Sequence, residues 1–135
     1  MGNKDPYIIE LPKILDERGN LSFLEGEKHI PFGINRTYWI YDVPGGESRG
    51  GHSYKKNQEF IIALSGSFDV TLHDGVTEKV YSLNRSYYGL YVPNGIWRSI
   101  GNFSTNSLAF IAASTDFNED DYERNFEKYL KDKNG

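Results

Sequence analysis

The sequence predicts an all-β domain, a barrel of about ten strands followed by one short C-terminal helix. Segments rich in aromatic and β-branched residues recur about every ten residues, which is the spacing of strands in sandwiches and barrels. Aromatic residues make up 15% of the 135-residue chain, and their side chains favour strands. Apolar residues at helical spacing occur only near the end of the chain. The length fits a single domain, residues 1–135, with a core of its own.

The expected strands occupy residues 7–115. The first segment, YIIELPKIL, ends at a turn through Gly19, and RTYWIYDVP ends at Pro44. EFIIALSG is a continuous apolar run, which indicates a strand buried on both faces. In SFDVTLHDGVTEKVYSL, alternating apolar residues precede Asp74 and Gly75, which predicts a hairpin with a two-residue turn. YYGLYVPNGIWRSIGN and NSLAFIAAS supply the last strands.

The tail, residues 118–131, is expected to form the helix. Asn118 is a suitable N-cap, acidic residues follow it, and lysines come last, as the helix dipole favours. Apolar residues lie three or four positions apart, as on one face of a helix: Tyr122, Phe126, Tyr129 and Leu130.

Charge and composition exclude several functions. The net charge of -4 at pH 7 argues against a general nucleic-acid binder. The absence of cysteine excludes disulfides and thiolate metal sites. The sequence has neither an apolar run long enough for a membrane-spanning helix nor a recognisable secretion signal. We therefore expect a cytoplasmic protein that does not bind membranes.

Residues 45–66 have the spacing of the first cupin motif, G-x5-H-x-H-x3–4-E-x6-G. His52 and Glu59 occupy two ligand positions, but Tyr54 stands in place of the second histidine. The second cupin motif is recognisable at Pro93-Asn94-Gly95, and there Arg98 replaces the third histidine. Arginine stays protonated and repels a cation. Because His52 and Glu59 alone are too few for a tight transition-metal site, we expect no metal.

Several stretches together resemble the nucleotide-sugar 3,4-ketoisomerases, metal-free cupins that act on dTDP-4-keto-6-deoxy-D-glucose. They are DERGNL, RTYWIYDVP, RGGHSYKK, FIIALSGSFDVTLHDG and YYGLYVPNGIWR, and the resemblance extends over residues 7–115. It implies a cupin jelly-roll barrel, a homodimer and a reaction without a cofactor. Many members of this family have a histidine at the position of Tyr54, so the role of this position stays open.

The implied reaction moves a carbonyl from C4 to C3 of the sugar, by removal of the C3 proton and return of a proton at C4. Histidine suits the base because its unperturbed pKa is about 6.5. Of the three histidines, only His52 lies in a motif, whereas His29 and His73 are expected in loops. His52 is therefore the predicted base.

The resemblance adds three residues to the predicted catalytic set. It places Tyr38 at the sugar, where its hydroxyl could relay a proton. Arg98, at a former ligand position, is expected to point into the barrel. The family's D-x-R-G turn brings Arg18 to the substrate. The predicted substrate-binding residues are Arg49 and Lys55, which could hold the diphosphate by charge-assisted hydrogen bonds, and Tyr54 and Trp97, which are expected to line the barrel.

Two alternatives remain open beside the ketoisomerase. One is a catalytically silent cupin that binds the sugar nucleotide, and the other is a related 3,5-epimerase. The epimerases carry a histidine–aspartate pairing that this sequence does not show. The resemblance further implies that the product feeds an aminotransferase that makes a 3-amino-3,6-dideoxyhexose for surface glycans such as lipopolysaccharide. The configuration of the product at C4 is left open.

Overall fold

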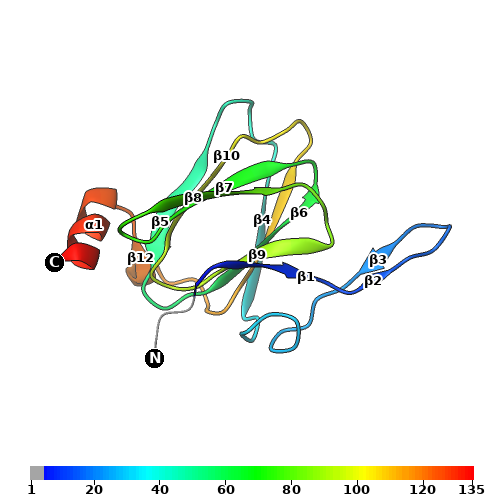
Figure 1. Cartoon of the computed structure of the whole chain (residues 1–135), viewed down its shortest axis with the longest axis horizontal. Helices are drawn as coiled ribbons and strands as arrows, with labels where there is room; N and C mark the ends of the chain where they lie inside the picture. Colours follow the sequence, from blue (N-terminus) through cyan, green and yellow to red (C-terminus); the bar gives the residue numbers. More distant parts are fainter. Residues whose placement is uncertain (1–4) are drawn as a thin grey trace.

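The computed structural model describes residues 5–135, which form two five-stranded antiparallel sheets that face each other (Figure 1). The prediction of an all-β jelly roll with one C-terminal helix is confirmed. Within the described residues, hydrogen bonds do not join the two sheets into one closed barrel. The first sheet, in spatial order, consists of β1 (Tyr7–Glu10), β9 (Tyr88–Val92), β6 (Glu59–Ser65), β11 (Leu108–Ala113) and β4 (Arg36–Tyr41). The second consists of β12 (Tyr122–Glu123), β5 (Arg49–Tyr54), β10 (Trp97–Gly101), β7 (Phe68–His73) and β8 (Glu78–Leu83).

The main hydrophobic core lies between the two sheets. Phe68, Val70 and Leu72 alternate with less buried residues along β7, as the sequence pattern predicts, and belong to one buried cluster with Ile61 of β6 and Ile111 of β11. Because side chains alternate between the two faces of a strand, only one face of β7 packs into the core.

Strand β6 is buried on both faces, which confirms the interpretation of EFIIALSG. Ile61 belongs to the core between the sheets. Phe60 belongs to a second cluster with Tyr91, Leu11 and Phe32. The segment that follows β1 thus covers the outer face of the first sheet.

The hairpin between β7 and β8 has a longer turn than predicted. His73 pairs with Glu78, which leaves a four-residue loop rather than a two-residue turn. The carboxylate of Asp74 accepts hydrogen bonds from the backbone N–H groups of Val76 at 2.8 Å and Thr77 at 2.9 Å. This side-chain cap stabilises the longer loop, because short polar side chains compete for backbone donors in turns.

The C-terminal helix begins later than predicted, so the expected start at residue 118 is wrong. Asn118 caps a 3₁₀ turn, η1 (Glu119–Asp121), and strand β12 follows it. The helix α1 covers Phe126–Asn134, and Asn125 is its N-cap. The helix begins late because Tyr122 and Glu123 of β12 pair with the end of β5, which holds them in an extended conformation.

Helix α1 packs on the outer face of the second sheet, over Trp97. The Trp97 ring lies 5.1 Å from the ring of Phe126 and 5.6 Å from the ring of Tyr129. Arg98, the next residue of β10, points the opposite way and is buried between the sheets. None of the helices in residues 5–135 is long and apolar enough to cross a membrane.

A hairpin of β2 (Lys13–Ile14) and β3 (Leu21–Ser22) projects from the body of the molecule (Figure 1). Its apolar side chains have little cover within the chain: Ile14, Leu15, Leu21 and Phe23 are 54%, 70%, 54% and 42% exposed. Arg18 lies in the turn at its tip.

Candidate active site

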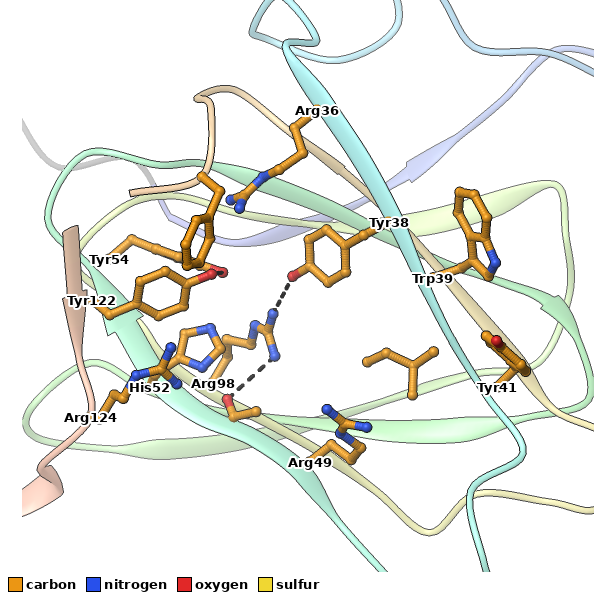
Figure 2. A pocket seen from close by; sticks show the side chains of 13 residues that line it. Arg36, Tyr38, Trp39, Tyr41, Arg49, His52, Tyr54, Arg98, Tyr122 and Arg124 are labelled. Atoms are coloured by element: carbon orange, nitrogen blue, oxygen red, sulfur yellow. Dashed lines mark hydrogen bonds between the residues drawn. The ribbon is translucent and has the colours of Figure 1, made fainter. Parts of the chain in front are cut away.

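A cavity of about 650 Å³ opens between β4 of the first sheet and β5, β10 and β12 of the second (Figure 2). We call it the β4–β5 cavity. It brings together five of the residues predicted from the sequence: Tyr38, Arg49, His52, Tyr54 and Arg98.

Strand alternation explains why these side chains meet. Arg36, Tyr38 and Ile40 are the more buried residues of β4, and all three line the cavity. On the facing sheet, His52 of β5 is the direct neighbour of Arg98 in β10. Because paired residues of adjacent strands point to the same face, His52 and Arg98 enter the cavity side by side.

His52 is enclosed but makes no hydrogen bond through its ring. The residue is 5% exposed, and neither ring nitrogen has a partner among residues 5–135. Its ring meets the rings of Tyr54 and Tyr122 edge-on, with centroids 4.8 and 4.9 Å away. Burial, followed by the positive charges of Arg98, Arg124 and Arg36, lowers the pKa of His52 to about 3. The imidazole is therefore neutral at pH 7, with a free lone pair available to accept a proton.

Arg98 and Glu59 form a buried ion pair behind the cavity. Their side chains are 2% and 1% exposed, and Arg98 Nε donates to Glu59 Oε1 at 2.8 Å. Arg98 Nη2 also donates to the Tyr38 hydroxyl at 2.7 Å, and Nη1 donates to the carbonyl oxygen of Gly50 at 3.3 Å. These bonds hold the guanidinium at one orientation, and Figure 2 shows the one to Tyr38.

Two tyrosine hydroxyls donate to the second oxygen of this carboxylate. Tyr38 Oη donates to Glu59 Oε2, and Tyr54 Oη lies 3.1 Å from the same oxygen. Tyr54 Oη is also 3.3 Å from the hydroxyl of Tyr122. Burial raises the pKa of Tyr38 well above its usual value; Arg98 opposes this shift, and Glu59 adds to it. Tyr38 is therefore protonated in the resting protein.

The residues at the cupin ligand positions do not fit a transition metal. Glu59 is already paired with Arg98, and Tyr54 and Arg98 replace two histidines. The described part of the chain contains no group of three or more potential metal-binding side chains. A tight site for such an ion needs about four ligands, of which the protein usually supplies at least three.

Three predicted residues lie outside the β4–β5 cavity of their own chain. The Lys55 ammonium donates to the carbonyl oxygen of Asp120 at 3.1 Å and faces a different depression. Trp97 packs beneath α1. Arg18 is 89% exposed and ion-paired with Asp16 at 2.6 Å.

The cavity is also lined by residues that were not predicted as site residues, among them Arg36, Phe117, Tyr122 and Arg124. Arg36 could have been found, because it lies two positions before Tyr38 in the same strand and so shares its face. Tyr122 and Arg124 were not identified as site residues because the tail was interpreted as a helix from residue 118. In the structure, they enter the cavity from β12 and from the residue just after it.

The lining of the cavity is strongly cationic. Four arginines contribute to it, and none of the lining residues in the described chain is acidic: Arg36, Arg49, Arg98 and Arg124. Of these, Arg98 pairs with Glu59 and Arg124 with Glu119, each at 2.8 Å. Arg36 and Arg49 form no salt bridge within the described residues, so their charges are the ones left uncompensated. A cationic cavity in a protein of net charge -4 indicates an anionic ligand.

A jelly roll in which a histidine, a tyrosine, a glutamate and an arginine occupy the cupin ligand positions defines a cupin without the usual set of metal ligands. Comparison with known proteins gives the family within this class. The family model described as "FdtA: WxcM-like, C-terminal" matches residues 4–134, and the chain belongs to this family.

Proteins with similar sequences and structures are named as 3,4-oxoisomerases or 3,4-ketoisomerases. The chain is 39% identical over 126 residues to the TDP-4-oxo-6-deoxy-alpha-D-glucose-3,4-oxoisomerase of Aneurinibacillus thermoaerophilus, a match that covers 91% of each chain. A 3,4-ketoisomerase from Helicobacter canadensis superposes with a TM-score of 0.93 at 36% identity, covering 97% of this chain and 98% of the other. A histidine-to-asparagine mutant of the 3,4-ketoisomerase QdtA from Thermoanaerobacterium thermosaccharolyticum, in complex with TDP-4-keto-6-deoxyglucose, superposes with a TM-score of 0.92 at 34% identity, over 94% of this chain and 92% of the other.

Proposed function

We propose that this protein is an isomerase that converts dTDP-4-dehydro-6-deoxy-D-glucose into the dTDP-3-dehydro-6-deoxyhexose. The observation that carries the proposal is His52, a buried neutral imidazole in a cationic cavity, whose two ring nitrogens have no hydrogen-bond partner among residues 5–135. The relatives named 3,4-oxoisomerase or 3,4-ketoisomerase support the same reaction.

The chemistry requires a base and nearby positive charge. The C4 ketone acidifies the hydrogen on C3, so that His52 can remove it as a proton. The electron pair of the C–H bond then forms the C3–C4 double bond, and negative charge develops on O4. Arg98 and Arg36 lie in the same cavity and can stabilise this charge. Return of one proton to C4 and transfer of the O3 proton to O4 leave the ketone at C3 and a hydroxyl at C4.

The diphosphate needs a site of its own, and the cavity arginines supply it. Arg36, Arg49 and Arg124 line the cavity, and guanidinium groups bind phosphate oxygens by charge-assisted hydrogen bonds. We assign the diphosphate to these three residues and not to Lys55, whose ammonium faces a different depression.

Incubation with dTDP-4-keto-6-deoxyglucose in deuterated buffer, followed by ¹H NMR, tests the function. A ketoisomerase yields a new ketone at C3 and deuterium at C4. A 3,5-epimerase would keep the ketone at C4 and place deuterium at C3 and C5. A silent binding protein would shift the nucleotide resonances without turnover. Either of the last two results, in place of the first, would refute the proposal.

We further propose that the protein acts as a homodimer in the cytoplasm. The exposed apolar side chains of the projecting hairpin support a partner surface, because such a strand pair is poorly covered by its own chain. Dimerisation would also give Arg18 a route to a substrate, since this residue lies outside the cavity of its own chain. The product would supply an aminotransferase that makes a 3-amino-3,6-dideoxyhexose for surface glycans.

A further inference from the structure

Strand β5 has one residue more than its partner β10 beside the β4–β5 cavity. Arg98 of β10 pairs with His52, and the next pair, two residues further along β10, joins Ile100 to Arg49. Two steps along β10 therefore match three steps along β5, which is a β-bulge. Gly50 lies within this bulge and has a φ of 75°, a left-handed conformation that glycine adopts readily.

The bulge explains why Arg49 and His52 enter the same cavity (Figure 2). In a regular strand, side chains alternate between the two faces, so a residue three positions before His52 would point away from it. The extra residue shifts this alternation by one. Arg49 is thus paired with Ile100, whose side chain is buried between the sheets.

The missing side chain of Gly50 leaves space that the Arg98 guanidinium uses. A Cβ atom at this position would lie 2.2 Å from Arg98 Nη1 and 3.6 Å from His52 Cε1. Non-bonded heavy atoms need about 3.5 Å, so the guanidinium could not stay where it is beside any larger residue. The carbonyl oxygen of Gly50 also accepts a hydrogen bond from Nη1 at 3.3 Å.

Arg98 can move away from a new side chain only by giving up other bonds. Its Nε donates to Glu59 at 2.8 Å, and its Nη2 donates to the Tyr38 hydroxyl at 2.7 Å. The residue is 2% exposed, so water cannot replace these partners easily. The size of residue 50 therefore determines where the guanidinium lies.

We propose that Gly50 is a positioning residue of the active site, which holds the Arg98 guanidinium where negative charge develops on the keto sugar. The inference rests on the proposed function, in which Arg98 stabilises the charge on O4. Gly50 does not touch the reacting atoms and acts through Arg98. Because the diphosphate is assigned to other arginines, a change at Gly50 should affect the chemical step and not the binding of TDP.

The test compares kcat for the keto sugar, followed by NMR, with the affinity for TDP, measured by calorimetry. Gly50→Ala fills the space beside Nη1, and Gly50→Asn fills it with a residue that tolerates a positive φ. We expect both variants to lower kcat by about 10²-fold, the lower end for loss of one preorganised donor to an oxyanion. The affinity for TDP should be nearly unchanged, and thermal unfolding shows whether each variant is folded.

Two other glycines provide matched controls. Gly51→Ala changes the next residue of the same strand, where a Cβ atom would meet Trp97 at 3.6 Å, an ordinary contact. Gly46→Ala imposes similar backbone strain, because Gly46 has a φ of 84°, but its Cβ would meet no atom of the described chain within 4 Å. Both controls should keep kcat close to that of the wild type.

A second background tests whether Gly50 acts through Arg98. Arg98→Lys keeps a positive charge beside Glu59 but removes Nη1, the atom that the new side chain would meet. Adding Gly50→Ala to Arg98→Lys should lower kcat much less than Gly50→Ala does in the wild type, since residues in contact are not additive. Equal losses in the two backgrounds would show that Gly50 does not act through Arg98.

Several outcomes would overturn the inference. Normal kcat in a folded Gly50 variant would do so, and so would an equal loss in Gly46→Ala, which would assign the effect to backbone strain. A parallel loss of TDP affinity would show that the whole bulge has changed. If neither Gly50 variant folds while both controls fold, the fold itself requires this glycine and the inference is refuted. A wild-type protein without turnover would refute the proposed function, a failure that is seen before any variant is compared.

Discussion

The arginines that surround His52 lower the pKa of its imidazole in the free protein, and two of them, Arg36 and Arg124, are also expected to bind the diphosphate of the substrate. In the free protein, Arg98, Arg124 and Arg36 add to burial and lower the pKa of His52 to about 3. A base works best when its pKa is near the working pH. The diphosphate of a bound substrate would neutralise part of the positive charge. Substrate binding is therefore expected to raise the pKa of His52 towards neutrality.

If substrate binding raises the pKa of His52, kcat/KM and kcat should depend differently on pH. The profile of kcat/KM reports the free enzyme, and that of kcat reports the complex. Activity needs neutral His52, so each profile should fall on its acid side, below the pKa that it reports. We expect the fall in kcat/KM well below pH 6.5 and the fall in kcat at a higher pH. Rate measurements across acid pH in buffers free of phosphate and sulfate will check this, and coincident acid limbs would contradict it.

Replacing the base gives the second prediction. His52→Asn should lower kcat by about 10²–10⁴-fold, the usual contribution of a positioned acid–base group, and leave the affinity for TDP nearly unchanged. The matched controls are His29→Gln and His73→Gln. In both, the replaced histidine caps a backbone N–H, of Glu25 at 2.8 Å and of Gly75 at 3.0 Å, outside the cavity. Near-normal turnover of His52→Asn would show that this residue is structural.

Among the elements, the central strands could be predicted from sequence and the tail could not. The cupin spacing of β5 and β10 is a local pattern that singled out His52 and Arg98, whereas Tyr38 was placed at the sugar by the family resemblance; the structure brings all three into one cavity. Strand β12 exists only because it pairs with β5, a contact between residues far apart in the chain. Local helix signals near Asn118 gave no indication of that pairing.

The segment from β12 to α1 leads to the third prediction. Arg124 enters the cavity from this segment and Arg36 from β4, and each is expected to bind the diphosphate. Arg124→Gln and Arg36→Gln should weaken TDP binding roughly 10-fold, because a hydrogen bond to a charged group contributes about 1.5–3 kcal/mol. Calorimetry with TDP will measure this. Arg85→Gln, in an exposed loop, is the control, and equal affinities for all variants would place the diphosphate elsewhere.

For the whole molecule, the buried Arg98–Glu59 pair predicts that activity does not depend on metal. Arg98 neutralises the Glu59 carboxylate within the protein, so this carboxylate is not free to bind a metal. The purified protein should contain far less than one equivalent of transition metal, and chelators should leave turnover unchanged. Elemental analysis will check this. A stoichiometric metal that is lost in His52→Asn would contradict the metal-free mechanism.

The projecting hairpin gives the last prediction, which concerns two copies of the chain. Ile14, Leu15, Leu21 and Phe23 are largely exposed on this hairpin, and burying them against a second copy would stabilise a dimer by the hydrophobic effect. Light scattering should give about twice the chain mass of 15.4 kDa. The sequence could not predict that Arg18 lies outside the cavity of its own chain, because this position depends on how the hairpin projects from the molecule. A clean monomer would contradict the prediction.

Mixed dimers then show which cavity Arg18 serves. Arg18→Ala and His52→Asn should each be weakly active alone. If Arg18 acts in the cavity of the partner subunit, a mixture of the two variants contains heterodimers with one intact cavity. Activity should then recover to about a quarter of the wild-type rate, because half of randomly mixed dimers are heterodimers and each has one intact site of two. If Arg18 acts within its own chain, no cavity in the mixture is intact and activity stays low. Full activity of Arg18→Ala alone would show that this arginine does not contact the substrate in either arrangement.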